Sequence, residues 1–590
     1  MADTCAGHGA ATCSGQNNFH FMDGRFFSHV VLPILCFTPV ATLILFPLLW
    51  RATGSFLGWY LRKKTDGRRC HILELVDADE KKFNESRRSS TSSAESAEDG
   101  GWEKVDTHTT GAARNGDSPD DNWDGIVGFF HPFCNAGGGG ERVLWAAIRA
   151  TQQRWPKAKC VVYTGDHGVT KDAMLARVKN RFNIHLHPPT INFLYLSTRH
   201  WVLASTWPRF TLAGQSFGSL ILAWDAFSLL VPDIFVDTMG YAFALGLAKF
   251  LFGASVPTGA YVHYPTISTD MLDSLDTQGP ADAGASDANA SAARGVNAGQ
   301  GAGARGKVKK AYWRLFAAVY SRVGASADVV MTNSTWTQGH IRRLWGPLRD
   351  ARRNSTPGAA AVAHPIAVVY PPVAVRELEH EVEVTPASEA RREKVLLYIA
   401  QFRPEKNHQL ILHAFAEFLK SAGDTARDAR LVLVGSVRDD QDSKRVYQLR
   451  LLVNELQIRD RVEFHLDASW PEILDWLRRA SVGVNGMWNE HFGIGVVEYQ
   501  AAGLVAVVHD SGGPKLDIVV DVDGKPTGFH ATTAKEFADG FQAALSLSDP
   551  YAVRQRARQS AKRFTEEEFA RRWTEQMEKL VAAKGVKTRT

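Results

Sequence analysis

Short apolar runs alternate with longer helix-like stretches along most of this chain, and this alternation restricts the possible fold most strongly. Strands that are apolar along their whole length are typical of parallel sheets that helices cover on both faces. The first series of such runs therefore predicts a doubly wound α/β domain. Its strands are expected at Ile126–Pro132, Cys160–Gly165, Asp233–Thr238, Ala260–Pro265 and Asp328–Ser334.

A second series of the same kind begins after Arg391. Two series predict two doubly wound, Rossmann-like domains, and ligands of such domains bind at the carboxyl ends of the strands. We therefore expect a binding site in the cleft between the domains. The strands of the second series are expected at Val395–Phe402, Arg430–Ser436, Val462–His465, Ala480–Gly486 and Val505–Ser511.

The length of 590 residues allows two to four domains. Three segments are poor in large apolar residues and are interpreted as disordered or inserted: Ser86–Asn122, Asp276–Lys310 and Arg349–Ala363. The predicted division is an N-terminal segment (1–28), a transmembrane anchor (29–50), a basic and disordered linker (51–123), an N-terminal Rossmann-like domain (124–390, with the insertion 276–310), a C-terminal Rossmann-like domain (391–548) and a C-terminal helix (549–590) that packs back on the N-terminal domain.

Composition excludes several classes of protein. A net charge of +5 is small for this length and does not indicate a nucleic-acid-binding protein. The six cysteines form no CxxC or Cys/His spacing that would hold zinc. No nucleic-acid partner and no zinc site are expected.

The segment His29–Trp50 contains no Asp, Glu, Lys or Arg. It is long enough to cross a hydrocarbon core, which needs about 20 apolar residues. Basic residues gather just after it, from Arg51 to Arg69, so the bulk of the chain is expected in the cytosol. Three prolines in the segment leave a re-entrant or interfacial anchor as the alternative.

The stretch Trp201–Gly253 is strongly apolar and aromatic. It could form ordinary core helices. It could equally present tryptophan and phenylalanine side chains to a membrane interface. The sequence leaves both interpretations open.

Four consecutive glycines, Gly137, Gly138, Gly139 and Gly140, lie between a predicted strand and a predicted helix. Backbone amides of such a loop can approach an anion or sugar hydroxyls at a helix N-terminus. No Gly-Lys-Ser/Thr follows, so this is not a Walker loop. The alternative is a flexible turn.

Two cations, Arg403 and Lys406, follow the first strand of the second series and precede a helical stretch. Their position suits a diphosphate. A solvated helix start is the alternative.

Glu490 and Glu498 are eight positions apart, which on a helix would place both carboxylates near one face. They could hold a polar ligand at two points, or they could be two solvated acids. His263 ends a predicted buried strand and could be either a core residue or a catalytic one.

Together these residues resemble the family 4 retaining glycosyltransferases, which have the two-domain GT-B fold. The resemblance covers roughly Asp124 to Lys579. The residue sequences of several motifs are similar to those of the GDP-mannose α-1,2-mannosyltransferases. These enzymes extend the dolichol-linked precursor of N-glycans at the cytosolic face of the endoplasmic reticulum. These motifs are HPFCNAGGGGERVLW, DTMGYAF, YVHYPTIS, TNSTWT, YPPV, QFRPEKNH and NEHFGIGVVEYQAAG.

The resemblance implies a role for each matching residue. Arg403 and Lys406 would neutralise the leaving GDP, Glu498 would bind the ribose hydroxyls, and Glu490 would lie near the transferred sugar. His263 would contact the donor sugar. The remaining assignments are backbone groups: the amides of Phe492, Gly493 and Ile494 for hexose hydroxyls, and Gly138–Gly140 for the donor phosphates or the acceptor.

The implied reaction transfers mannose from GDP-mannose, with retention, to the Man3GlcNAc2 and then the Man4GlcNAc2 oligosaccharide on dolichol diphosphate, which gives Man5GlcNAc2. No metal and no cofactor are expected, and other mannosyltransferases of the pathway are conceivable partners. Two alternatives stay open: a related enzyme such as a phosphatidylinositol glycosyltransferase, and a non-catalytic scaffold tethered to the membrane.

Overall fold

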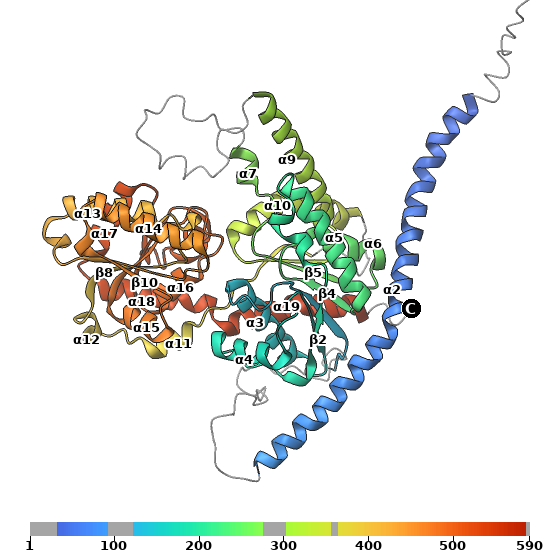
Figure 1. Ribbon diagram of the computed structural model, residues 1–590, viewed down its shortest axis with the longest axis horizontal. Helices are drawn as coiled ribbons and strands as arrows, with labels where there is room; N and C mark the ends of the chain where they lie inside the picture. Colours follow the sequence, from blue (N-terminus) through green and yellow to red (C-terminus); the bar gives the residue numbers. More distant parts are fainter. Residues whose placement is uncertain (1–31, 92–121, 275–302, 356–363, 586–590) are drawn as a thin grey trace, which may run out of the picture. The chain divides into compact units, whose positions relative to one another are not determined.

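The computed structural model describes residues 32–91, 122–274, 303–355 and 364–585 (Figure 1). The chain forms two compact units, Met1–Gly58 and Trp59–Thr590. Helix α2 (Leu32–Thr91) begins in the first unit. Everything that bears on the candidate site belongs to the second unit.

The N-terminal domain contains a parallel sheet of seven strands in the order β3-β2-β1-β4-β5-β6-β7 (Figure 1). Buried side chains alternate between the two faces of this sheet. Val127 and Phe129 of β1 point into a core formed with α3, α4 and α19, whereas Phe235 of β4 packs against Phe227 of α5 on the other face. The strands are β1 (Ile126–Phe130), β2 (Lys159–Thr164), β3 (Ile191–Tyr195), β4 (Ile234–Asp237), β5 (Thr258–Val262), β6 (Val329–Thr332) and β7 (Ala367–Val368), and the helices are α3 (Gly139–Arg154), α4 (Lys171–Phe182), α5 (Thr211–Leu229), α6 (Ala242–Phe252), α7 (Thr269–Ser274), α9 (Gly303–Gly324) and α10 (Thr335–Ser355).

The C-terminal domain contains a parallel sheet of six strands in the order β10-β9-β8-β11-β12-β13. The prediction of two doubly wound α/β domains is thus confirmed. The strands are β8 (Glu393–Ile399), β9 (Arg430–Gly435), β10 (Val462–Leu466), β11 (Ala480–Asn485), β12 (Val505–His509) and β13 (Gly528–Ala531), and the helices are α13 (His408–Ser421), α14 (Asp440–Glu455), α15 (Trp470–Arg479), α16 (Ile494–Ala501) and α17 (Ala534–Leu545).

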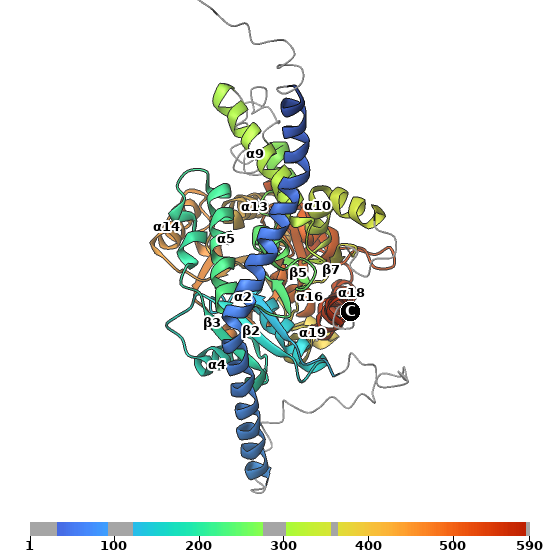
Figure 2. The same ribbon diagram turned by 90° about the vertical axis from the view of Figure 1, so that its right-hand side faces the viewer.

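The chain passes between the two sheets twice. It leaves the N-terminal domain through α11 (Val375–Glu381) and α12 (Pro386–Glu389). It returns through α18 (Pro550–Ala561) and α19 (Glu566–Gly585), which are labelled near the C-terminus in Figure 2, and α19 lies beside α3 (Figure 1). Trp573 of α19 stacks on Phe129, with ring centroids 6.3 Å apart, and its indole N–H donates to Thr151. The last helix is therefore part of the N-terminal core.

Three predicted disordered segments are partly helical. Residues 51–91, assigned to the linker, continue α2, and Arg69 of this helix forms a 2.6 Å ion pair with Asp233. Residues 349–355 belong to α10, where buried Arg349 donates to the backbone carbonyls of Asp328 and His364. The predictions were wrong there because helices rich in charge and alanine resemble linkers in composition. Residues 303–310 likewise belong to α9; residues 92–121, 275–302 and 356–363 lie outside the described residues.

The predicted anchor His29–Trp50 is described only in part: the backbone from Leu32 and the side chains from Pro47 onward. In the described ranges, no helix has both the length and the apolar character required to cross a membrane. The apolar stretch 201–253 forms α5 and α6. Leu222 and Phe227 of α5 are fully buried, but Phe217 is 53% exposed and Trp224 is 39% exposed, so α5 is a core helix with an aromatic outer face. A membrane contact of that face stays a prediction.

Candidate active site

Lys406 lies in a single 3-10 turn, Pro404–Lys406, between β8 and α13. The hydroxyl of Tyr398 donates to its backbone carbonyl, and the next residue, Asn407, has a left-handed backbone with φ +50°. The Lys406 ammonium lies 2.5 Å from Oε2 of Glu490 and 3.1 Å from the sulfur of Met487. The structure thus brings together one predicted diphosphate ligand and the first predicted acid.

This ion pair fixes the charge of Glu490. Burial of the carboxyl favours the protonated form, but the adjacent Lys406 cation outweighs burial and holds the pKa of Glu490 below its ordinary value. Glu490 is therefore ionised at neutral pH.

Glu490 does not lie on the same helix as Glu498, and that sequence prediction was wrong. Helix α16 begins at Ile494, and Gly493, with φ +105°, turns the backbone before it. Glu490 belongs to the loop between β11 and α16, where its backbone carbonyl accepts a 2.8 Å hydrogen bond from the amide of Gly513. Left-handed backbone ends a helix, so the two acids are presented by different elements.

Arg403 is oriented differently from Lys406. Its guanidinium is 33% exposed, and Nη1 lies 3.7 Å from the carboxylate of Glu405. No ion pair between Arg403 and Glu490 is present in the described part of the chain. Arg403 can therefore accept an anion without breaking a buried pair.

Glu498 lies in the middle of α16 and is partly buried. Within the described residues, its carboxylate has no hydrogen-bond or ion-pair partner. Burial raises its pKa to about 6, and the more distant charges of Arg142 and Arg181 only partly offset this effect. Such a carboxylate has its acceptor positions open to ligand hydroxyls.

The glycine loop is held by a side chain just inside α3. The backbone of Gly137 is left-handed, with φ +81°. The amide of Gly138 donates to Glu141 over 2.5 Å, and the other oxygen of this carboxylate lies 3.6 Å from Nε2 of buried His131. Burial opposes ionisation of Glu141, but its contacts with His131 and the Gly138 amide lower its pKa overall.

The same loop meets His263 and the start of α16. A Cβ atom built on Gly139 would lie 2.8 Å from Cδ1 of Ile494, and one built on Gly140 would lie 3.7 Å from Nε2 of His263. Gly139 therefore permits a close backbone approach, whereas a Cβ atom on Gly140 would make only an ordinary van der Waals contact. The glycine loop, His263 and the start of α16 therefore lie close together.

His263 is neutral at physiological pH. Burial, followed by the nearby His131, lowers its pKa to about 4. Its Nε2 lies 3.1 Å from the backbone carbonyl of Thr238, which can only accept, so Nε2 carries the proton. The Thr238 hydroxyl lies 2.8 Å from Nδ1 of His131, and this contact links His263 to the glycine-loop network.

Comparison with known proteins decides the family. Residues 124–345 match the model described as the ALG11 mannosyltransferase N-terminus, and residues 383–564 match glycosyl transferases group 1. The GDP-Man:Man(3)GlcNAc(2)-PP-Dol alpha-1,2-mannosyltransferase of Neurospora crassa is 71% identical over 565 residues, which cover 96% of this chain and 99% of that protein. The chain belongs to this mannosyltransferase family. The Mus musculus protein of the same name is 44% identical over 463 residues, covering 77% of this chain and 87% of that protein.

Solved structures with the same two-domain fold are distant in sequence. The Candida albicans trehalose-6-phosphate phosphatase N-terminal domain has a TM-score of 0.56 at 12% identity, over 79% of this chain and 98% of that chain. A UDP-forming trehalose-phosphate synthase from Burkholderia xenovorans has a TM-score of 0.51 at 13% identity, over 78% and 99%. At these identities the likeness concerns the fold alone.

Sequence reasoning assigned no role to several residues of the candidate site. The His131–Glu141–Thr238 network was missed, although a glutamate three positions after Gly138 has the spacing of a capping box. Tyr264 and Trp336 stack on His491, next to Glu490. No local sequence pattern predicts this contact, because His491 is distant in sequence from both residues.

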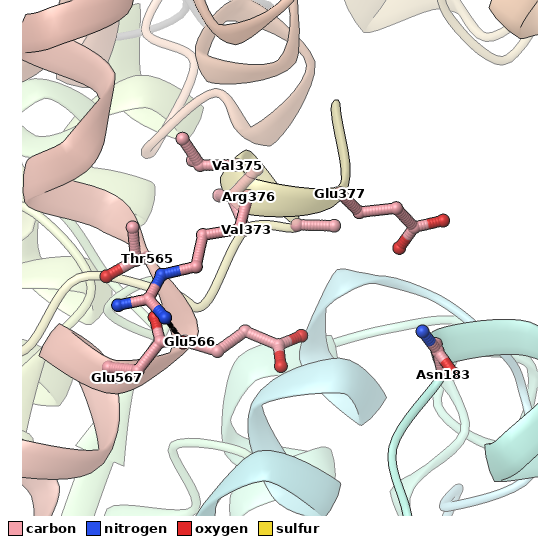
Figure 3. Close-up of a pocket in the computed structure, with 9 residues that line it drawn as sticks. Asn183, Val373, Val375, Arg376, Glu377, Thr565, Glu566 and Glu567 are labelled. Carbon is pink, nitrogen blue, oxygen red and sulfur yellow. Dashed lines mark ion pairs between the residues drawn. The ribbon is translucent and has the colours of Figure 1, made fainter. Parts of the chain in front are cut away.

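A small cavity of about 100 Å³ lies where the chain crosses between the domains (Figure 3). Arg376 and Glu567, which form a 3.1 Å ion pair, and Asn183 are among the residues that line it. Lys406, Glu490 and His263 do not line it, so this cavity is distinct from the candidate site. Across the described ranges, no cluster of three or more His, Cys, Asp or Glu side chains has the geometry to hold a metal ion.

Proposed function

We propose that this protein transfers α-1,2-linked mannose from GDP-mannose to Man3GlcNAc2 on dolichol diphosphate, and then to the Man4GlcNAc2 product, which gives Man5GlcNAc2. The 71% identity to a relative whose name states donor, acceptor and linkage carries this proposal. The ion pair of Lys406 with Glu490 and the glycine loop support it, because a cation and an acid lie together there and the loop lies against the start of α16.

Donor binding begins with the diphosphate. Lys406 and Arg403 follow the first strand of the C-terminal domain and can supply positive charge to it. An incoming diphosphate competes with Glu490 for Lys406. Glu498 can accept hydrogen bonds from the ribose hydroxyls. Because these bonds favour the ionised carboxylate, donor binding is expected to lower the pKa of Glu498.

The transferred sugar lies next to Glu490 in this proposal. Amides of Phe492, Gly493 and Ile494 bind its hydroxyls, and the neutral ring of His263 contacts it from the N-terminal domain. When Lys406 binds the diphosphate instead of Glu490, the carboxylate of Glu490 becomes free to accept a hydrogen bond from a mannose hydroxyl. The aromatic ring of Phe492 packs on Tyr370 and fixes this backbone.

Transfer proceeds with retention by a front-face displacement. The bond between mannose C1 and the β-phosphate oxygen breaks as the acceptor 2-hydroxyl oxygen bonds to C1 from the same face. The acceptor proton moves to the leaving phosphate oxygen, so GDP departs with that proton. Positive charge from Lys406 and Arg403 stabilises the negative charge that develops on the leaving group. We expect no metal requirement, and transfer should continue in excess EDTA.

We place the protein at the endoplasmic reticulum membrane, with residues 29–50 as a single-pass anchor and the catalytic domains in the cytosol. The basic residues that follow Trp50 support this orientation. Asn354 begins an Asn-Ser-Thr acceptor and is exposed on α10, so it would be glycosylated if the domain were lumenal. Mass spectrometry of the membrane-derived protein should find it unmodified.

The deciding experiment incubates the purified full-length chain in dolichol-containing vesicles with GDP-mannose and the Man3GlcNAc2 lipid. The expected result is a lipid-linked product longer by two hexoses. A donor panel and a phosphatidylinositol acceptor distinguish the alternatives. Preference for a UDP-sugar or for phosphatidylinositol would favour the related lipid glycosyltransferase, and no transfer to any acceptor would favour the non-catalytic scaffold.

A further inference from the structure

The loop that presents Glu490 is held by the N-terminal domain on both sides of this residue. On one side, Nδ2 of Asn489 donates a 2.8 Å hydrogen bond to the carboxylate of Asp270 in α7. On the other side, the imidazole of His491 stacks on Tyr264, with ring centroids 4.2 Å apart and planes 18° apart. Tyr264 directly follows His263.

The N-terminal groups that grip this loop are connected to one another. Trp336 of α10 stacks on His491 at 5.4 Å, with planes 12° apart, and contacts the ring of His340 edge to face at 4.3 Å. His340 lies 2.6 Å from the Thr269 hydroxyl and 3.5 Å from the carboxylate of Asp270. The hydrogen-bonding side and the stacking side are therefore parts of one cluster.

Glu490 itself is bonded to groups of the C-terminal domain. Its carboxylate pairs with Lys406, and its carbonyl accepts from Gly513. Asn489 has a left-handed backbone, with φ +50°, and its amide donates to Ser511. The loop is thus backed by its own domain, while the two residues that flank Glu490 depend on the other domain for their side-chain contacts.

We propose that Asn489 and His491 are positioning residues, through which the N-terminal domain sets the conformation of Glu490 for sugar transfer. This inference rests on the proposed function. When the domains separate, both flanking contacts are lost and Glu490 is held by contacts within its own domain, such as those with Lys406 and Gly513; when they meet, the loop is clamped at two points. Donor binding by the C-terminal domain alone does not require this clamp.

The stack requires a flat ring more than an imidazole. Burial, with smaller effects of its charged neighbours, lowers the pKa of His491 to about 4, so the ring is neutral when it stacks. The ionisable groups near it are Glu490, Lys406, His340 and Glu405. A phenylalanine can keep the stacking with Tyr264 and Trp336, whereas alanine cannot.

The test compares His491→Ala, His491→Phe, Asp270→Ala and Asp270→Asn with the wild type in the dolichol-vesicle assay, and measures GDP affinity by calorimetry. We expect His491→Ala and Asp270→Ala to lower kcat by about tenfold to a hundredfold, because small displacements of reacting groups cost this much. The Kd for GDP should change by less than about twofold, since loss of transition-state positioning alone lowers kcat. His491→Phe and Asp270→Asn should recover most of the rate.

Tyr447→Ala on α14 is the matched control, because it removes an aromatic ring that is 64% exposed in the C-terminal domain. It should leave both constants unchanged. If His491→Phe is as slow as His491→Ala, the imidazole itself acts and the inference is wrong. Equal losses in kcat and GDP affinity, or an unchanged kcat in both alanine variants, would also overturn it. A wild type that transfers no mannose contradicts the proposed function instead.

Discussion

Lys406 and Glu490 form a 2.5 Å ion pair although they are 84 positions apart in sequence. The pair joins the turn after β8 to the loop after β11, and these two strands are adjacent in the sheet. Glu498, by contrast, has no ion-pair partner in the described ranges, and its pKa is shifted upward rather than downward. The two acids of this site therefore differ in charge state near pH 6, which leads to different predictions for each.

Removing the Lys406 ammonium should abolish most activity. Lys406→Ala deletes a cation that stabilises the leaving diphosphate, and loss of one such group costs about 10²–10³ in kcat. GDP affinity should fall as well, and both can be measured by steady-state transfer and calorimetry. The control is Arg427→Ala, which removes an exposed pair with Asp424 in the same domain and should change neither constant. Activity of Lys406→Ala within about threefold of the wild type would contradict this role.

Substitution of the two acids should separate binding from transfer. Glu498→Gln is expected to raise the Kd for GDP with a smaller effect on kcat, since it weakens acceptance of ribose hydrogen bonds. Glu490→Gln is expected to lower kcat without weakening GDP binding, because the carboxylate acts on the sugar and its removal frees Lys406 for the diphosphate. If kcat and the Kd for GDP changed equally in both variants, the two acids would not have separate roles in binding and transfer.

Stability and donor binding should depend oppositely on pH through Glu498. Its pKa of about 6 exceeds the ordinary 4.5, so between these values the native state binds more protons than the unfolded state. The free energy of unfolding therefore falls as the pH rises through this range. Glu498→Gln should be more stable than the wild type at pH 7.5, by at most about 2 kcal/mol, with the difference vanishing below about pH 4.5.

GDP affinity of the wild type should decrease as the pH falls through about 6, because protonation removes hydrogen-bond acceptor capacity from Glu498. The Gln variant should lack this decrease. Thermal denaturation and calorimetry at pH 5, 6 and 7.5 measure both effects. A wild-type GDP affinity that is constant over this range would show that Glu498 does not contact the nucleotide.

Gly512 supports the backbone of Glu490 and should not tolerate a side chain. Its φ is +67°, and a Cβ atom there would lie 2.3 Å from the carbonyl oxygen of Glu490. Gly524 is a matched control, with φ +69° and open space around its Cβ position. Gly524→Ala should cost about 1–2 kcal/mol of stability from left-handed strain and retain its kcat. Gly512→Ala should in addition lower kcat by about a hundredfold through displacement of Glu490, and equal kcat values in the two variants would argue against this support.

The two-domain fold could be predicted from the sequence, and the roles assigned to the site residues stay predictions. The central strands of both sheets are buried on both faces, so they appear as continuous apolar runs, as in Ile126–Phe130. The edge strands β3 and β13 carry partly exposed residues, and β7 has only two residues; these three were missed. Local pattern also placed Glu490 on the helix of Glu498, because nothing short of the backbone geometry at Gly493 shows that the helix begins later.

The contacts between the two domains could not be predicted from the sequence. The stack of His491 on Tyr264 joins residues 227 positions apart, and the bond of Asn489 to Asp270 spans 219 positions. Neither pair has a periodic or motif-based signal. These contacts form where the two domains pack against each other. That packing depends on the complementarity of the two domain surfaces rather than on local secondary-structure propensity.

Glu490, in its pair with Lys406, is proposed to take part in mannose transfer to the dolichol-linked acceptor. To test this role, the wild type and Glu490→Ala are incubated with GDP-mannose and Man3GlcNAc2-diphosphate-dolichol, and the products are digested with an α-1,2-mannosidase. We expect the wild-type product to be longer by two mannoses, both removed by the α-1,2-mannosidase. Glu490→Ala should bind GDP but form almost no product. A wild-type protein that forms no such product would contradict the proposed reaction, and a Glu490→Ala variant that forms it at the wild-type rate would contradict the role of Glu490.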